Sequence, residues 1–207
     1  MSRIFGNKDN FAIEYEFIDN PEKVYINSTY GYIKLWVKGT DICTYNKNYQ
    51  HEGDIYYLVE WFCDKIEYIL GYDIFPLSVK GNTAVELIEN ADQYESDDML
   101  EFDLWYAAKS RWILNHCWFN ARNGAVLPCV YFRRFEKCIE ISWDNTFWRK
   151  EGIIFSSEKD IHIVQFEVFS KILADFLISS VNDLEQRIGN GEKLKVMKRQ
   201  INILKGD

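Results

Sequence analysis

The spacing of apolar residues changes three times along this chain, and these changes constrain the fold more than any other sequence feature. Apolar and polar residues alternate over Phe11–Ile18, as in a strand with one buried face. The spacing becomes helical over Asp54–Leu70, returns to a strand pattern over residues 129–143, and is helical again before Ile188. Strands and helices that occupy separate stretches of sequence predict an α+β fold.

At the N-terminus the sequence predicts a β-meander of three or four strands. Turn signals at Asn20-Pro21 and at Gly39-Thr40-Asp41 separate these strands. The predicted strands are Phe11–Ile18, Tyr25–Asn27, Tyr30–Val37 and a short Ile42–Tyr45.

The middle of the chain predicts three helices. Asp54 can cap the first helix, and Gly71 can end it. An exposed acidic loop, Asp92–Asp98, separates the second helix from the third, which can run on toward Asn120. The predicted helices are Asp54–Leu70, Thr83–Ala91 and Met99–Trp112.

A hairpin and two further helices are predicted in the last third of the chain. The hairpin strands are separated by three residues, Phe135-Glu136-Lys137. The predicted elements are the strands Cys129–Arg134 and Cys138–Trp143, a short strand at Gly152–Phe155, a long helix that starts at Ser156 or Ser157 and ends at Ile188, and a basic helix at Glu192–Lys205.

We therefore predict an α+β fold in which an antiparallel sheet, built from the N-terminal meander and the later hairpin, packs against the long C-terminal helix. The chain has 207 residues, of which 47% are hydrophobic, so it can bury a sizeable core. We expect residues 1–188 to form a single domain and residues 189–207 to form a basic C-terminal helical tail.

The charge is distributed unevenly. Residues 1–108 hold 8 Lys and Arg against 20 Asp and Glu, whereas residues 109–207 hold 16 against 12. The net charge of −8 argues against bulk affinity for nucleic acid or anionic lipid. The two halves could lie on opposite surfaces or partly neutralise each other in the folded chain, or the acidic half could meet a basic partner.

Composition and motifs exclude several classes of protein. No apolar run approaches the roughly 18 residues of a membrane helix, so we expect no membrane contact and a cytoplasmic location. The five cysteines have irregular spacing, which favours buried free thiols over a disulfide framework or a zinc site. The chain has no phosphate-binding glycine loop, no GxSxG and no zinc-finger spacing, so we expect no cofactor and no metal.

Residues 111–148 are rich in side chains that could do chemistry. If the chain were a small enzyme or a ligand sensor with an anion-binding pocket, its residues would be His116, Arg122, Arg133, Glu140 and Asp144. Arginine would hold an anionic ligand, and His116 would act as acid or base. Glu140 and Asp144 could also resemble a Mg²⁺-binding pair.

Each of these residues also has a structural interpretation. Arg133 and Glu140 face each other across the hairpin, and we favour an internal ion pair. Asp144 more simply closes a strand with an Asx turn. His116 lacks a partner at metal-site spacing and can hydrogen-bond to the backbone, and Cys117 lies among aromatic residues typical of a core.

The stretch Gly81–Ala108 contains eight acidic residues and no Lys or Arg. Aromatic residues between the acids distinguish it from a simple solubilising tail, although a solvated surface is the plainer interpretation. Acidic groups with exposed aromatics suit fast, steered association with a basic protein surface. The predicted partner-binding residues are Glu95, Asp97, Asp98, Glu101, Asp103, Trp105, Trp112 and Arg133, with Trp118 as a further candidate.

The leading hypothesis is a non-catalytic protein-binding module of the bacterial or phage cytoplasm, such as an immunity or inhibitor protein or an accessory subunit of a toxin or defence system. It would bind one protein partner with a basic surface. The first alternative is the enzyme or sensor built around His116, Arg133 and Glu140. The second is nucleic-acid binding through the basic C-terminal half, which we disfavour because that half lacks stacking aromatics in its basic tail.

Overall fold

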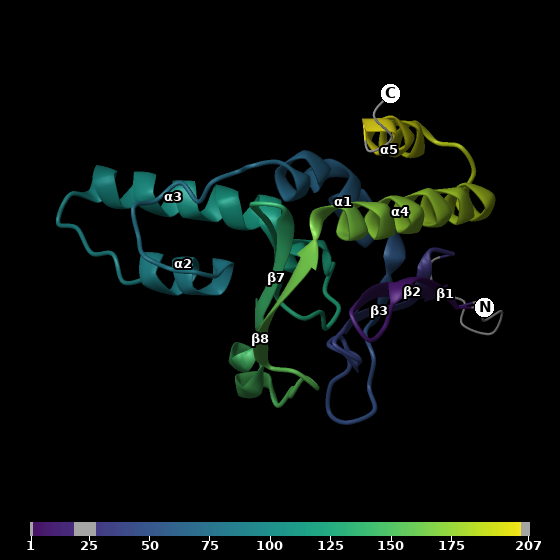
Figure 1. The fold of residues 1–207 in the computed structure, drawn as a ribbon, viewed down its shortest axis with the longest axis horizontal. Helices are drawn as coiled ribbons and strands as arrows, with labels where there is room; N and C mark the ends of the chain where they lie inside the picture. Colours follow the sequence, from purple (N-terminus) through teal and green to yellow (C-terminus); the bar gives the residue numbers. More distant parts are fainter. Residues whose placement is uncertain (1, 19–27, 204–207) are drawn as a thin grey trace.

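The computed structural model describes residues 2–18 and 28–203, which form an α+β fold with two antiparallel sheets (Figure 1). The strands are β1 (Arg3–Asn7), β2 (Phe11–Phe17), β3 (Tyr30–Val37), β4 (Thr40–Asp41), β5 (Glu52–Asp54), β6 (Val130–Phe135), β7 (Cys138–Asp144) and β8 (Lys159–Gln165). The helices are α1 (Ile55–Leu70), α2 (Ala84–Ala91), α3 (Met99–His116), α4 (Phe166–Ile188) and α5 (Glu192–Ile203), with 3-10 turns η1 (Trp118–Ala121) and η2 (Thr146–Glu151).

The first sheet is the predicted N-terminal meander, in the order β1-β2-β3-β4, with β5 also paired to β3. In β2 the side chains of Phe11, Ile13, Tyr15 and Phe17 enter the core, as the alternation predicts. Strands β1 and β5 were not predicted from the sequence, because both are short and contain glycine. The predicted strand Tyr25–Asn27 lies outside the described residues.

The second sheet has the order β6-β7-β8 and contains the predicted hairpin. Phe135 pairs with Cys138, so the loop has two residues, Glu136 and Lys137, rather than three. Glu136 adopts a left-handed conformation with a φ of 53°, which lets two residues reverse the chain.

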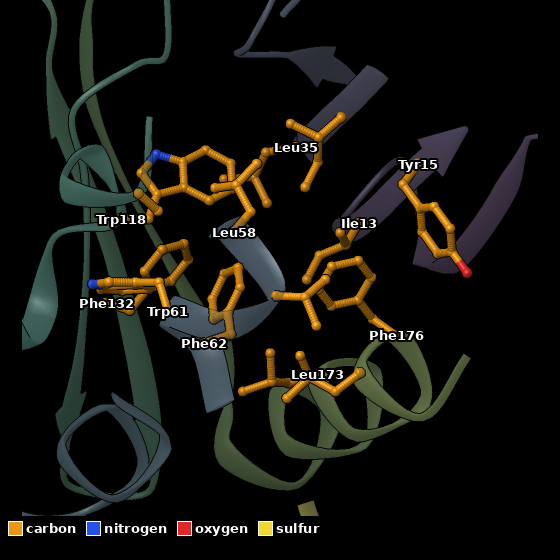
Figure 2. Close-up of a cluster of buried hydrophobic side chains, with 14 of the residues drawn as sticks. Ile13, Tyr15, Leu35, Leu58, Trp61, Phe62, Trp118, Phe132, Leu173 and Phe176 are labelled. Atoms are coloured by element: carbon orange, nitrogen blue, oxygen red, sulfur yellow. The ribbon is translucent and has the colours of Figure 1, made fainter. Parts of the chain in front are cut away.

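Helix α1 lies at the centre of the core. Phe62 makes ring contacts with Trp118 from η1, Phe132 from β6 and Phe176 from α4, at centroid distances of 6.1, 5.5 and 5.9 Å. Figure 2 shows Phe62 between Phe132 of the second sheet on one side and Ile13 of the first sheet and Phe176 of α4 on the other. One aromatic ring therefore joins parts of the chain that are more than 110 residues apart.

The long helix α4 packs against both sheets and against α1. This confirms the predicted fold class of antiparallel sheet packed on a long C-terminal helix. The terminal helix α5 packs on α1 and α4 through Leu194, Met197 and Ile201, which belong to the same core. The division of the chain into a domain of residues 1–188 and a tail of residues 189–207 stays a prediction.

The predicted start of the long helix at Ser156 or Ser157 is wrong. Residues 159–165 form β8, which pairs with β7 from Lys159 opposite Asp144 to Gln165 opposite Cys138. The apolar residues of this segment continue the helical spacing of α4, but all three of them (Ile161, Ile163 and Val164) are β-branched, and the edge of β7 supplies hydrogen-bond partners.

Two short predicted strands are also wrong. Ile42–Tyr45 is mostly turn, because the carboxylate of Asp41 accepts hydrogen bonds from the N–H of Cys43 and the hydroxyl of Thr44 and so ends β4. Gly152–Phe155 follows η2 as irregular chain, and only Phe155 forms a β-bridge, with Tyr45.

The starts of the first three helices follow the sequence prediction closely. Asp54 caps α1 by accepting a hydrogen bond of 3.0 Å from the N–H of Tyr56, and Gly71 ends the helix. Thr83 caps α2, and α3 runs from Met99 to His116 before the chain turns into η1.

Candidate protein-binding arm

Helices α2 and α3 form an arm that extends from the rest of the molecule. In Figure 1 the arm lies on the opposite side of the second sheet from the N-terminal sheet, and the α2–α3 loop is at its far end. Buried residues of α3 lie only in its second half, at Lys109, Trp112 and His116. The first half of α3 is therefore open to contact by another molecule.

The tip of the arm is acidic and exposed. We define the acidic tip as Glu95, Asp97, Asp98, Glu101 and Asp103, all of which are exposed. Large apolar side chains lie between these acids: Met99 is 72% exposed, Leu100 68% and Phe102 39%. Exposed apolar side chains surrounded by like charges mark a surface suited to a partner of opposite charge.

Within the acidic tip, Asp98 also has a structural role. Its carboxylate caps α3 by accepting hydrogen bonds of 2.9 and 3.2 Å from the N–H groups of Leu100 and Glu101. Hydrogen bonds from Tyr94 and Ser96 hold the pKa of Glu101 below its usual range, so this carboxyl is ionised near neutral pH. The tip is thus ordered as well as charged.

Trp105 and Lys109 hold the α2–α3 loop against α3. Trp105 stacks on Tyr94 with ring centroids 4.0 Å apart, and its indole N–H donates to the carbonyl of Ala91 at 3.0 Å. The buried ammonium of Lys109 pairs with Asp92 at the end of α2. Trp105, a predicted partner-binding residue, is partly buried by these contacts and presents only part of its ring.

The base of the arm is fixed by Trp112 and His116, whose rings stack at 4.1 Å. The indole N–H of Trp112 donates to the carbonyl of Asp73, and the ring packs edge-on against Phe75 at 5.0 Å. Trp112 is 3% exposed, so it supports the arm and does not offer its ring to a partner.

His116 is fully buried and joins α3 to two other segments. Its Nδ1 lies 2.8 Å from the carbonyl oxygen of Phe132, and its Nε2 lies 3.0 Å from a carboxylate oxygen of Asp73. Burial lowers the pKa of His116 despite these two acceptors, which act in the opposite direction. The expected backbone-bonded histidine is confirmed, with Asp73 as a partner that the sequence did not indicate.

Arg133 and Glu140 form the internal pair that we favoured. The Nε of Arg133 donates to Glu140 at 2.8 Å, and its Nη2 donates to the carbonyl of Asn82 at 2.9 Å. The other carboxylate oxygen of Glu140 accepts hydrogen bonds from the N–H of Ala84, at 2.6 Å, and the hydroxyl of Ser142. Glu140 is 1% exposed, so this pair anchors the N-terminus of α2 to the second sheet.

The remaining candidates also have structural partners. Asp144 accepts from the N–H and hydroxyl of Thr146, the predicted Asx turn, and pairs with Lys159 at 3.0 Å. Although burial acts to raise the pKa of Asp144, these partners lower it overall. The guanidinium of Arg122 lies 3.9 Å from the ring centroid of Phe119.

Two further predicted residues lie in the interior. Trp118 is fully buried in the main core, so it is not available as a contact for a partner. Burial raises the pKa of Cys117 well above its usual value, which fits the expected core thiol. In the part of the chain that the structure describes, all five cysteines are free.

A cleft of about 1060 Å³ opens between the segment leading into α2 and the tip of the β6–β7 hairpin. Arg133 lies on its wall, together with Arg134, Ile74 and Phe135. Neither His116 nor Glu140 lines it, because both are buried behind the wall. The structure therefore does not gather His116, Arg133 and Glu140 around one open pocket, as the enzyme hypothesis requires.

The basic C-terminal residues are partly neutralised. In α5, Lys193 pairs with Glu60 of α1 at 3.0 Å, and Lys198 pairs with Glu185 of α4 at 2.7 Å. These ion pairs leave less positive charge for nucleic-acid phosphates than the sequence suggested.

Neither a membrane-spanning helix nor a metal-binding cluster is present among the described residues. No helix there is both long enough and apolar enough to cross a lipid bilayer. Residues 2–18 and 28–203 also contain no group of three or more His, Cys, Asp and Glu side chains placed to hold a metal ion.

The ordered acidic arm, with its exposed apolar side chains, is a surface suited to contact with a protein of opposite charge. Residues 1–187 match the family described as Immunity protein 42, and the chain belongs to this family. The match ends within the last turn of α4, so α5 lies outside it. No curated protein and no solved structure matches the chain. The family agrees with the leading sequence hypothesis, which named an immunity protein.

Proposed function

We propose that this chain is a non-catalytic immunity protein that inhibits one protein toxin by binding it through the acidic tip. The observation that carries the proposal is the tip itself, where five exposed carboxylates surround Met99, Leu100 and Phe102. The carboxylates would steer a basic surface toward the arm, and the apolar side chains would then lose contact with water.

The partner that fits this surface is a protein with a basic groove. A toxin that acts on nucleic acid has such a groove, because it must attract phosphates. The carboxylates of the tip would take the place of those phosphates and block the groove. A bacterial or phage cytoplasm is part of the proposal, and the five free cysteines agree with a reducing compartment.

The test is affinity capture of the tagged protein from its native host, with bound proteins identified by mass spectrometry. It is run beside a variant with Asp97→Asn, Asp98→Asn, Glu101→Gln and Asp103→Asn. Asparagine at position 98 can still cap α3, so the variant removes charge without removing the cap. We expect a stoichiometric partner with the unmodified chain and at least a tenfold weaker partner signal with the variant.

A matched control neutralises the same number of carboxylates away from the arm, at Glu67, Glu151, Glu167 and Glu192, each changed to Gln. The captured protein is then expressed alone and with each form of the chain. The proposal requires that it stops growth alone, and that the unmodified chain and the control relieve this while the tip variant does not. Equal protection by the tip variant would contradict the proposal.

A further inference from the structure

The outward face of α3 carries an apolar stripe where a surface helix normally carries polar residues. We define the α3 stripe as Leu100, Leu104, Ala107 and Leu114, all exposed. Leu104 is 63% exposed and Leu114 50%. The intervals of four, three and seven residues are those of a seam along which one helix packs on another.

The α3 stripe lies almost opposite the packed face of the helix. The packed face is marked by the buried residues Lys109, Trp112 and His116. At 3.6 residues per turn, the centre of the stripe is rotated by roughly 150° from the centre of that face. The leucines of the α3 stripe are therefore not part of the packed core that holds the arm in place.

We infer that a second copy of this chain covers the α3 stripe, with the two α3 helices antiparallel about a twofold axis at Ala107. Leu100 lies seven residues before Ala107 and Leu114 seven residues after it. In an antiparallel pair, Leu100 of each copy then faces Leu114 of the other. The small side chain of Ala107 lets the two helices approach closely where they cross.

Charge is complementary in the same arrangement. Asp103 lies four residues before Ala107 and Arg111 four residues after it, so each Asp103 faces Arg111 of the other copy. Both side chains are exposed, and among the described residues neither forms an ion pair with another. The two helix dipoles would also run in opposite directions, which is favourable. A parallel pair would instead place the acidic ends of both helices together.

This inference goes beyond the proposed function and does not rest on it. Asp97 and Asp98 lie outside the span from Leu100 to Leu114, at the outer ends of the antiparallel pair. A dimer built this way would present two acidic tips facing away from each other. Leu100 and Asp103 contribute to both proposed surfaces. Substitutions at Asp97 and Asp98 therefore test toxin binding alone, and substitutions at Leu104 and Leu114 test dimerisation alone.

The first experiment is sedimentation velocity of the full chain from about 1 to 100 μM, the range in which a modest helix–helix interface associates. We expect a concentration-dependent dimer. The variant Leu104→Glu with Leu114→Glu should dimerise at least a hundredfold more weakly, because each interface would hold four glutamates in place of four leucines. Circular dichroism verifies that the variant remains folded, which its exposed positions favour.

A charge exchange tests the register. Asp103→Arg alone and Arg111→Asp alone should each weaken the dimer roughly three- to tenfold, since each places like charges opposite one another. The double variant carries both changes and should regain most of the loss. If the loss of dimer affinity in the double variant equals the two single losses combined, the antiparallel register is overturned.

A cross-link tests the axis. With Ala107→Cys, two copies meeting at the proposed axis should form a disulfide-linked dimer under mild oxidation, whereas Glu67→Cys on α1 should not. A chain that stays monomeric at all concentrations overturns the inference, as does a dimer unaffected by the two glutamates. It is also overturned if the chain is monomeric and the glutamates abolish capture of the toxin, because the stripe would then belong to that partner.

Discussion

At the scale of the residue, Glu140 illustrates how a buried carboxylate can resemble a catalytic group in sequence and act as a structural joint. It bonds to Arg133 and Ser142 within the second sheet and to the N–H of Ala84 at the start of α2. Sequence spacing predicted the pairing with Arg133 from strand register. The contact with Ala84 was not predictable, because it joins residues 56 positions apart.

Changing Glu140→Gln should destabilise the protein by roughly 3 kcal/mol, because the largely buried Arg133, whose side chain is 12% exposed, would lose its counter-charge. The measurement is urea unfolding at pH 7. Asp97→Asn on the exposed tip serves as the control and should change the free energy of unfolding by less than about 0.5 kcal/mol. A similar small effect for Glu140→Gln would show that the pair does not anchor the arm.

His51 predicts a pH dependence of stability. Its ring is 1% exposed, and its Nδ1 lies 2.7 Å from the carbonyl oxygen of Val126. Burial lowers its pKa from 6.5 to about 4. Between these values the unfolded chain binds the proton more readily, so the free energy of unfolding falls as the pH is lowered through this window.

Between pH 7 and pH 5 this one histidine should reduce the free energy of unfolding by about 2 kcal/mol. Urea unfolding at several pH values in that range measures it, above the range in which Glu14 titrates with its pKa of about 2. His51→Asn can keep a hydrogen bond to Val126 without titrating, and it should reduce the pH dependence. The part that remains belongs to groups such as His116 and His162, whose pKa values burial also lowers. An unchanged slope in this variant would assign the effect to other groups.

At the scale of the element, helix boundaries were more predictable than strand boundaries. Caps are local: Asp54, Thr83 and Asp98 each accept hydrogen bonds from N–H groups two or three residues ahead. A strand such as β8 depends on the edge that it meets, and the segment 159–165 carries no local signal that outweighs its helical spacing. This is why the start of the long helix was misplaced.

The cap of α3 gives a prediction for the arm. Asp98→Ala should destabilise the first turn of α3 by about 1 kcal/mol. Asp98→Asn should destabilise it by only a few tenths of a kcal/mol, because asparagine also caps helices well. Amide hydrogen exchange at Leu100 and Glu101 reports this turn directly. Equal exchange rates in the two variants would mean that the carboxylate does not cap the helix in solution.

The sequence does not separate the outward face of α3 from its packed face. Leu100, Leu104 and Leu114 recur at helical spacing, and so do Trp105 and Trp112 on the packed side. Only burial separates the two apolar faces, since Trp112 packs into the protein and Leu104 does not. Sequence periodicity alone cannot distinguish an apolar helix face that packs inside the protein from an apolar helix face that is exposed.

At the scale of the whole molecule, the two sheets are joined through α1. Phe62→Ala should destabilise the protein by about 3–5 kcal/mol, because it removes a fully buried ring that contacts β6, α4 and η1. Thermal unfolding measures the effect. Tyr68→Ala on the exposed face of α1 is the control and should change the stability much less. If Phe62→Ala destabilises the protein no more than Tyr68→Ala does, the core is not built around the ring of Phe62.

The sequence by itself determined the α+β class, the hairpin, the helix caps and the acidic character of residues 81–108, because these depend on periodicity, on neighbours a few residues away and on composition. Tertiary structure decided that the strands form two sheets rather than one, that β8 exists, and that Glu140 and His116 are buried and anchor the arm, while Arg133 pairs with Glu140 and also lies on the wall of the cleft. Each of these depends on contacts between distant segments, and no local preference of the chain encodes which segments meet.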